Sequence, residues 1–164
     1  MHNIVITPFN NQPADRIFDL LLPIQRDEFG FQVTRQDQKD LEEIPVYYQN
    51  GNGNFWLALH GDALVGTIAL KDIGDNQVAL RKMFVKADYR GKEKGVAQNL
   101  LNQAVAWSKD KRVTDIFLGT TSKFLAAHRF YEKNGFREID KAALPQRFSA
   151  MSIDSKFYHH ALAS

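Results

Sequence analysis

The stretch Tyr89-Arg-Gly-Lys-Glu-Lys-Gly-Val-Ala-Gln-Asn-Leu-Leu101 joins a predicted strand to a predicted helix through a basic, glycine-containing loop. The strand covers residues 78–85, whose β-branched and aromatic content is typical of β structure. The helix is indicated by small and apolar residues recurring at i, i+3, i+4 and i+7, namely Ala97, Leu100, Leu101 and Ala104. This strand–loop–helix order predicts an α/β unit with a ligand site at the loop.

The loop has the chemistry of a pyrophosphate site. Glycine lets the backbone approach a ligand closely, and a helix N-terminus offers unpaired N–H groups and a partial positive charge. Three side chains, Arg90, Lys92 and Lys94, add full charges. The predicted binding residues in this region are Arg90, Gly91, Lys92, Lys94, Gly95, Val96 and Ala97.

Charge is concentrated around this loop. Residues 81–94 hold six basic and two acidic side chains, whereas the whole chain carries a net charge of only +2. A local positive field in a near-neutral protein favours a compact polyanion over a long nucleic acid, which would need an extended basic face. The glycine pattern alone is equally compatible with a solvated basic turn before an ordinary helix.

Two motifs resemble those of one enzyme family. Lys92-x-x-Gly95-x-Ala97 resembles the Gln/Arg-x-x-Gly-x-Gly/Ala signature of the GCN5-related N-acetyltransferases (GNAT), which binds the pyrophosphate of acetyl-coenzyme A (acetyl-CoA). The segment Ala127-His-Arg-Phe-Tyr131-Glu-Lys-Asn-Gly135-Phe136 resembles the second hallmark, Ala-x-x-x-Tyr-x-x-x-Gly-Phe. A predicted helix and strand separate the motifs, as in the family, and the resemblance extends from residue 3 to the C-terminus.

The resemblance implies a single N-acetyltransferase domain over residues 1–164. Its expected fold is α/β (α+β): a mixed, mostly antiparallel central sheet, splayed between strands 4 and 5 and flanked by about four helices. Acetyl-CoA would lie in the splay, and its extended pantetheine arm would pair with the backbone of Met83, Phe84 and Val85. The side chains of these three residues are equally suited to core packing.

Tyr131 matches the family's usual general acid. In that role its hydroxyl would protonate the coenzyme A thiolate that leaves when an amine attacks the thioester. Judged without the motif, a helix tyrosine beside Phe124, Ala127 and His128 would more often be a packing residue. With the motif, the resemblance favours catalysis.

The chain departs from the family pattern at two positions. Lys92 replaces Gln or Arg, which matters little because the loop binds mainly through backbone N–H groups. Ala79 stands where many relatives have a glutamate that acts as general base through water. Because an alkylammonium must lose a proton before it can attack, Asp27, Glu28, His128 or water alone are left as open candidates for the base.

Composition places the chain among globular proteins. It has 164 residues, 44% hydrophobic and 24% charged, which suits one domain with one substantial core. No apolar run is long enough to span a bilayer, and no signal-peptide pattern is present. The absence of cysteine excludes disulfides, thiolate metal sites and cysteine nucleophiles. We expect a cytoplasmic enzyme without a metal.

The remaining patterns predict one continuous unit without linkers or repeats. Pro45 should break or kink the second helix, a Gly61-Asp62 turn should form a hairpin, and Gly135 should close the last helix at its C′ position. The expected elements are strand 3–8, helices 13–26 and 35–49, strands 55–59, 64–70 and 77–86, a helix from 97, strand 114–120, helix 124–134 and strands 136–139 and 157–162.

The sequence does not identify the acceptor amine. The tail from Leu144 to Tyr158 resembles that of many small bacterial acetyltransferases, and is equally suited to walling the acceptor site or closing the sheet. The acidic run Asp37, Asp40, Glu42 and Glu43 is more often a solvated face than an amine site. We expect a small-molecule or peptide amine and no nucleic-acid or membrane partner, and leave homodimer formation open. The alternative function is a catalytically silent acyl-CoA-binding module.

Overall fold

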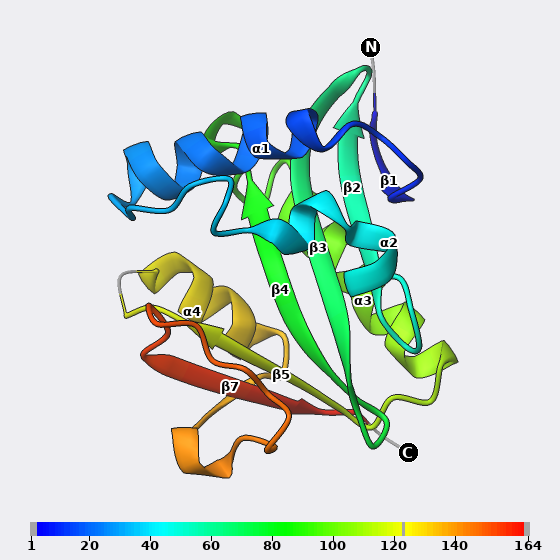
Figure 1. The fold of residues 1–164 in the computed structure, drawn as a ribbon, viewed down its shortest axis with the longest axis vertical. Coiled ribbons are helices and arrows are strands. Elements are labelled where there is room, and N and C mark those ends of the chain that lie inside the picture. The colour runs from blue at the N-terminus through cyan, green and yellow to red at the C-terminus, as the bar shows by residue number, and fades with distance from the viewer. Residues whose placement is uncertain (1–2, 123, 163–164) are drawn as a thin grey trace.

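One mixed sheet organises residues 3–122 and 124–162, which the computed structural model describes (Figure 1). Its seven strands lie in the order β1-β2-β3-β4-β5-β7-β6, and every neighbouring pair is antiparallel except β4 and β5. The mostly antiparallel sheet of the prediction is therefore confirmed. The strands are β1 Ile4–Pro8, β2 Asn54–His60, β3 Ala63–Gly74, β4 Gln77–Val85, β5 Asp115–Thr120, β6 Arg137–Ile139 and β7 Lys156–Ala161.

Helices cover both faces of the sheet. α1 (Ala14–Pro23) and α2 (Ile44–Tyr47) bury one face, and Figure 1 shows α2 in front of β3. α3 (Val96–Asp110) and α4 (Leu125–Lys133) pack on the opposite face, where Trp56, Leu80 and Leu118 lie in the core. Within the part of the chain that is described, no helix is long and apolar enough to cross a membrane.

The first helix follows from its apolar spacing. Ile17, Leu20, Leu21 and Ile24 recur at i, i+3, i+4 and i+7 and are all buried against the sheet. The helix continues past Pro23 into one wider π turn, Ile24–Glu28. That turn carries the chain towards the far end of β4, next to the predicted phosphate loop.

The helix predicted over residues 35–49 is wrong in its length. The structure has a 3-10 turn, Lys39–Glu42, followed by the four-residue helix α2. Pro45 stands in the first turn of α2, where its missing N–H costs no helical hydrogen bond, so it begins a helix rather than kinking one. Two short turns therefore bury Leu41, Ile44 and Tyr48 in place of one long helix.

The sheet splays between β4 and β5, as the family resemblance implies. The two parallel strands pair only at Gln77 with Asp115, Val78 with Ile116 and Ala79 with Phe117. Beyond this point β5 pairs with β7 up to Thr120, while β4 continues beside β3 alone. Residues 80–85 of β4 consequently have one edge without a partner strand among the described residues.

A β-bulge shapes this open part of β4. Thr67 of β3 pairs with Phe84 and Ala69 pairs with Arg81, so two residues of β4 lie opposite one of β3. Lys82 in the bulge has a left-handed backbone, with φ of 53°. The Thr67 hydroxyl donates a hydrogen bond of 2.7 Å to the Lys82 carbonyl and holds the bulge in place.

Gly135 ends α4 as predicted. Its φ is 90°, the Phe136 N–H donates to the Tyr131 carbonyl at 3.1 Å, and the Gly135 N–H donates to the Glu132 carbonyl at 3.4 Å. These are the two hydrogen bonds of a Schellman motif, and the rings of Tyr131 and Phe136 make the apolar contact that accompanies it. The motif therefore fixes the end of α4 and the position of Phe136.

Gly135→Val should destabilise the fold by on the order of 1–2 kcal/mol through backbone strain at positive φ. A further loss is expected because a Cβ at this position would lie 2.9 Å from Cε1 of His160. Chemical denaturation of the purified variant measures the effect. Gly30→Val is the matched control, since Gly30 has φ of +71° but no atom within 4 Å of a built Cβ. Equal losses in the two variants would show that the His160 contact contributes nothing.

Candidate active site

The predicted phosphate loop forms an uncapped helix N-terminus. Gly95 precedes α3 with a left-handed φ of 67°. No side chain caps the start of this helix, and its first turn contains no acidic residue. Gly91 is also left-handed, with φ of 103°, and its carbonyl accepts a hydrogen bond from the Gly95 N–H at 3.2 Å. The first N–H groups of α3, from Val96 and Ala97, therefore face out of the loop without competition from a carboxylate.

The cations predicted for this site separate into two groups. Lys92 and Lys94 are exposed on the loop itself. Arg90 instead pairs with Glu28 of the π turn, through Nη1 to Oε1 at 2.7 Å and Nη2 to Oε2 at 3.1 Å. Its Nε also donates to the Val85 carbonyl at 2.7 Å. Arg90 thus joins the end of β4 to the segment after α1 rather than extending over the loop.

The open edge of β4 leads directly into this loop. Met83 and Phe84 are half-buried and pack against the cores on opposite faces of the sheet, while Val85 is buried. Core packing of the side chains and an open backbone edge therefore occur together here. The side chains lie in the core, while the strand edge toward β5 has no partner strand. An extended chain with amide groups can pair with such an edge.

Tyr131 lies in α4, on the face of the sheet that α3 and α4 cover. Its side chain is 6% exposed and is surrounded by the rings of Phe130, Phe136 and Tyr158. The hydroxyl has no hydrogen-bond partner among the described residues, and no fully buried polar side-chain atom there lacks one, so the hydroxyl retains contact with solvent. Burial raises the pKa of Tyr131 above its ordinary value, which keeps the hydroxyl protonated.

Comparisons with known proteins agree with this geometry. The family model described as Acetyltransferase (GNAT) family matches residues 16–136. The chain belongs to the GNAT family. An acetyltransferase of this family from Staphylococcus aureus Mu50 is 38% identical, with a TM-score of 0.92 over 98% of this chain and 99% of that one.

Curated GNAT relatives are longer than this chain. N-acetylaspartate synthetase from Xenopus tropicalis is 36% identical over 102 residues, which are 61% of this chain and 37% of the relative. The chain therefore spans about a third of the length of that protein. The paiA N-acetyltransferase from Thermoplasma acidophilum, solved in complex with coenzyme A, shares the fold with a TM-score of 0.76 at 20% identity, over 98% and 99% of the two chains.

One cation beside the predicted loop was not found from the sequence. The ammonium group of Lys92 lies close enough to Lys133, in the last turn of α4, to lower the pKa of Lys133. Hydrogen bonds between Gln98 of α3 and Asn134 hold the two helices together beside this pair. The one signal for Lys133 in the sequence is its place near the end of the second motif.

The three side chains that are candidate bases in this GNAT protein lie in two places, Asp27 and Glu28 on the π turn and His128 in α4. Glu28 is bound to Arg90, and the buried His128 holds the Thr121 carbonyl at 2.9 Å through Nε2. Asp27 is exposed on the π turn. Ala79 is completely buried, in contact with Phe117 and Ile73. The position of the family's glutamate therefore contributes no proton acceptor.

A polar network lies on the α1 side of β4. The Lys82 ammonium is within 2.7 Å of the Gln38 Oε1 and 3.6 Å of the Asp40 carboxylate, and Asp40 accepts the Tyr48 hydroxyl at 2.5 Å. Burial lowers the pKa of Lys82. Gln25 and Gln38 exchange two amide hydrogen bonds. Within the acidic run of residues 37–43, Asp40 therefore has a structural role. It links the 38–48 segment to the bulge at Lys82.

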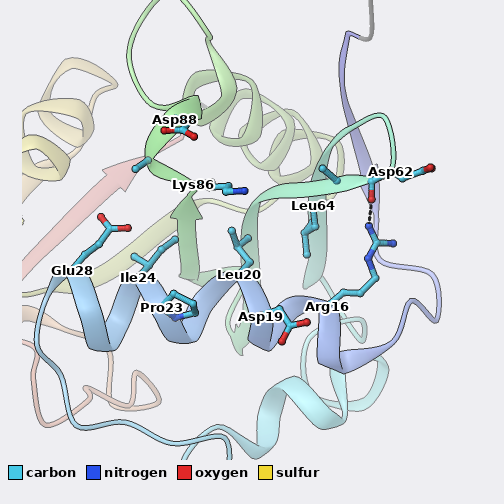
Figure 2. Close-up of a pocket in the computed structure, with 12 residues that line it drawn as sticks. Arg16, Asp19, Leu20, Pro23, Ile24, Glu28, Asp62, Leu64, Lys86 and Asp88 are labelled. Carbon is cyan, nitrogen blue, oxygen red and sulfur yellow. Dashed lines mark hydrogen bonds between the residues drawn. The ribbon is translucent and has the colours of Figure 1, made fainter.

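A cavity of about 520 Å³ opens beside the end of β4. Figure 2 shows Leu20 and Ile24 of the α1 segment on one side, Leu64 of β3 on another, and Lys86 extending between them. Its charged lining carries both signs: Arg16, Lys86, Asp19, Glu28, Asp62 and Asp88. No group of three or more metal-ligating side chains occurs within residues 3–122 and 124–162.

Proposed function

We propose that this chain is an acetyl-CoA-dependent N-acetyltransferase that moves an acetyl group to a primary amine by direct attack on the thioester. One observation carries the proposal: the open edge of β4, residues 80–85, continues into the uncapped N-terminus of α3. An extended ligand could pair its amide groups with the open edge of β4 and place a pyrophosphate at the N-terminus of α3. Coenzyme A has that composition.

The residues present fit coenzyme A. The N–H groups at the start of α3, with Gly91 and Gly95 left-handed around them, would hold the pyrophosphate, and Lys92, Lys94 and Lys133 would supply charge. Met83, Phe84 and Val85 would hold the pantetheine arm along β4. This assignment supports acetyl-CoA, the family's cosubstrate.

The chemistry would be divided between protein and cosubstrate. Bound acetyl-CoA supplies an acetyl thioester, an electrophile for an amine. The protonated hydroxyl of Tyr131, which retains solvent contact within an aromatic surround, would donate a proton to the leaving sulfur. The aromatic rings would hold the hydroxyl in place, so little reorganisation would be required during the reaction.

GNAT proteins act on amines, and the relative named N-acetylaspartate synthetase supports a small-molecule acceptor. We propose a small-molecule or peptide amine in a cytoplasmic setting, without nucleic acid or membrane as partner. A catalytically silent acyl-CoA-binding module is the second candidate. The buried Ala79 favours it, because the usual glutamate is missing.

Coenzyme A release distinguishes the two candidates. Polyamines, aminoglycosides, amino acids and short peptides would be screened with acetyl-CoA, and free thiol would be measured with a colorimetric reagent. We expect at least one class of amine to raise thiol release above the rate of acetyl-CoA hydrolysis. Tight acetyl-CoA binding with no amine-dependent release across the panel would identify a silent binding module.

A further inference from the structure

The segment between β6 and β7 covers the β5 side of the splay, on the face opposite α3 and α4. Leu144 and Phe148 of this segment pack with Ile73, Ala79 and Phe117 in a small separate core. The Ser155 N–H then donates to the Thr120 carbonyl at 2.8 Å, which fixes the segment to the end of β5. Figure 1 shows the segment passing in front of β5 and β7. The segment is therefore placed to contact an acceptor that approaches from this face.

Asp154 of this segment rests directly on the backbone of β5. A Cβ built on Gly119 would lie 2.6 Å from Oδ2 and 2.8 Å from Cγ of Asp154, so only glycine leaves room for the carboxyl group. The Met151 N–H donates to the same Oδ2 at 2.9 Å and orients it. The position of this carboxyl group is therefore set by β5 and by its own turn.

Asp154 lies at the level where the splay begins. Ala79 and Phe117 form the last pair between β4 and β5, and Gly119 is two residues further along β5. Since side chains alternate along a strand, Gly119 presents the same face as Phe117. Arg81 is two residues beyond Ala79 on β4, and its charge acts on the Asp154 carboxylate. Arg81 and Asp154 consequently flank the start of the splay on one face.

The carboxyl group therefore occupies the face from which the glutamate is missing. Ala79 packs against Phe117 on this same face, and Asp154 lies over Gly119, two residues further along β5. Tyr131 belongs to the opposite face, in the core with Ile116 and Leu118. A proton acceptor and a proton donor on opposite faces suit a reaction in which the amine enters from one side and the sulfur leaves on the other.

We propose that Asp154 accepts the proton that the acceptor ammonium must lose before it attacks the thioester. This inference rests on the proposed acetyltransferase function. One proton passes from R–NH₃⁺ to the carboxylate, and the nitrogen lone pair then forms the C–N bond. As the C–S bond breaks, its electron pair goes to sulfur, which is protonated by Tyr131. The nitrogen then loses a second proton, which reaches Tyr131 through solvent and restores its hydroxyl. Asp154 releases the first proton to water.

The charges around Asp154 are compatible with this role. Burial raises its pKa above the ordinary aspartate value, while the Met151 N–H and the charges of Arg81 and Lys141 oppose the rise. Asp154 is one of the residues that line a cavity of about 270 Å³, together with Ile139 of β6 and Phe157 of β7. The other charged groups that line this cavity are Glu138, Asp140, Lys141 and Lys156.

Asp154→Asn tests the proposal with the amine that the wild-type protein acetylates fastest in the panel. We expect kcat/KM to fall roughly tenfold at pH near 7, a modest loss for general base catalysis because water can also take the proton. Activity should recover as the pH approaches about 10, where a large fraction of the amine is neutral in solution. With a weakly basic hydrazide, already neutral at pH near 7, wild type and variant should react at similar rates. Asp140→Asn, in the same cavity, is the matched control.

Two further measurements do not depend on turnover. Calorimetry should show unchanged acetyl-CoA affinity for Asp154→Asn, and carbon-13 NMR of the wild-type aspartates should show one carboxyl group with a raised pKa that is absent from the variant. A wild-type protein without amine-dependent turnover refutes the proposed function. A full-rate Asp154→Asn enzyme, a defect that high pH does not restore, or an Asp154 carboxyl titrating at or below its ordinary value overturns the role of Asp154.

Discussion

Tyr131→Phe should lower kcat by roughly 10²-fold or more if the hydroxyl protonates the leaving thiolate. The substitution keeps the ring, and so retains its packing against Phe130, Phe136 and Tyr158. Because the hydroxyl has no hydrogen-bond partner among the described residues, removing it should leave the free energy of unfolding nearly unchanged. Steady-state kinetics with an amine from the panel, together with a denaturation curve, measures both effects.

The pH profile gives an independent test of the same residue. Burial raises the pKa of Tyr131, so the hydroxyl should remain protonated up to and beyond about pH 10, the ordinary tyrosine value. Loss of wild-type activity through deprotonation of Tyr131 should therefore occur only above that pH. Unchanged kcat in Tyr131→Phe combined with reduced stability would instead identify a packing residue.

Gly95→Asp should weaken acetyl-CoA binding by at least tenfold, about 1.4 kcal/mol. The new carboxylate would stand at the start of α3, where the N–H groups and the cations Lys92 and Lys94 now favour an anion. A side chain at this position would also have to accept the left-handed φ of 67°. Isothermal titration calorimetry on the folded variant measures the dissociation constant.

Gly30→Asp provides the matched control for Gly95→Asp. Gly30 is also left-handed, with φ of 71°, but lies in the segment after α1 and outside the loop. The control should share the cost of backbone strain while retaining acetyl-CoA affinity. Equal affinity in Gly95→Asp and wild type would refute the loop as the pyrophosphate site. Wild-type affinity should also fall as salt is added, because part of it comes from charge attraction.

The elements predicted well are those whose signals are local in the chain. The start of α3 at Val96 follows from glycine at Gly95 and the apolar spacing after it, and the end of α4 follows from Gly135. The two-residue hairpin at Gly61-Asp62 also formed, with His60 paired to Ala63. In each case the deciding interactions lie within one or two turns of backbone, so a short window of sequence contains them.

The prediction of one helix over residues 35–49 was wrong because more than one backbone structure can produce the same apolar spacing. Leu41, Ile44 and Tyr48 are buried as the pattern required, but Pro45 starts a new helix and the Asp40 carboxylate takes the Tyr48 hydroxyl. Periodicity reports which side chains are buried. It does not distinguish one continuous helix from two short turns that bury the same residues.

The sequence by itself determined the family motifs, the glycine-containing loop before α3 and the position of Tyr131 on a helix, because glycine conformation and helical spacing are properties of neighbouring residues. Only the tertiary structure decided which charged side chains lie close to one another. It joined Arg90 to Glu28, brought Lys133 to Lys92, and seated Asp154 on Gly119 at the start of the splay. Such contacts join segments far apart in the chain, and only the assembled sheet brings their side chains within reach.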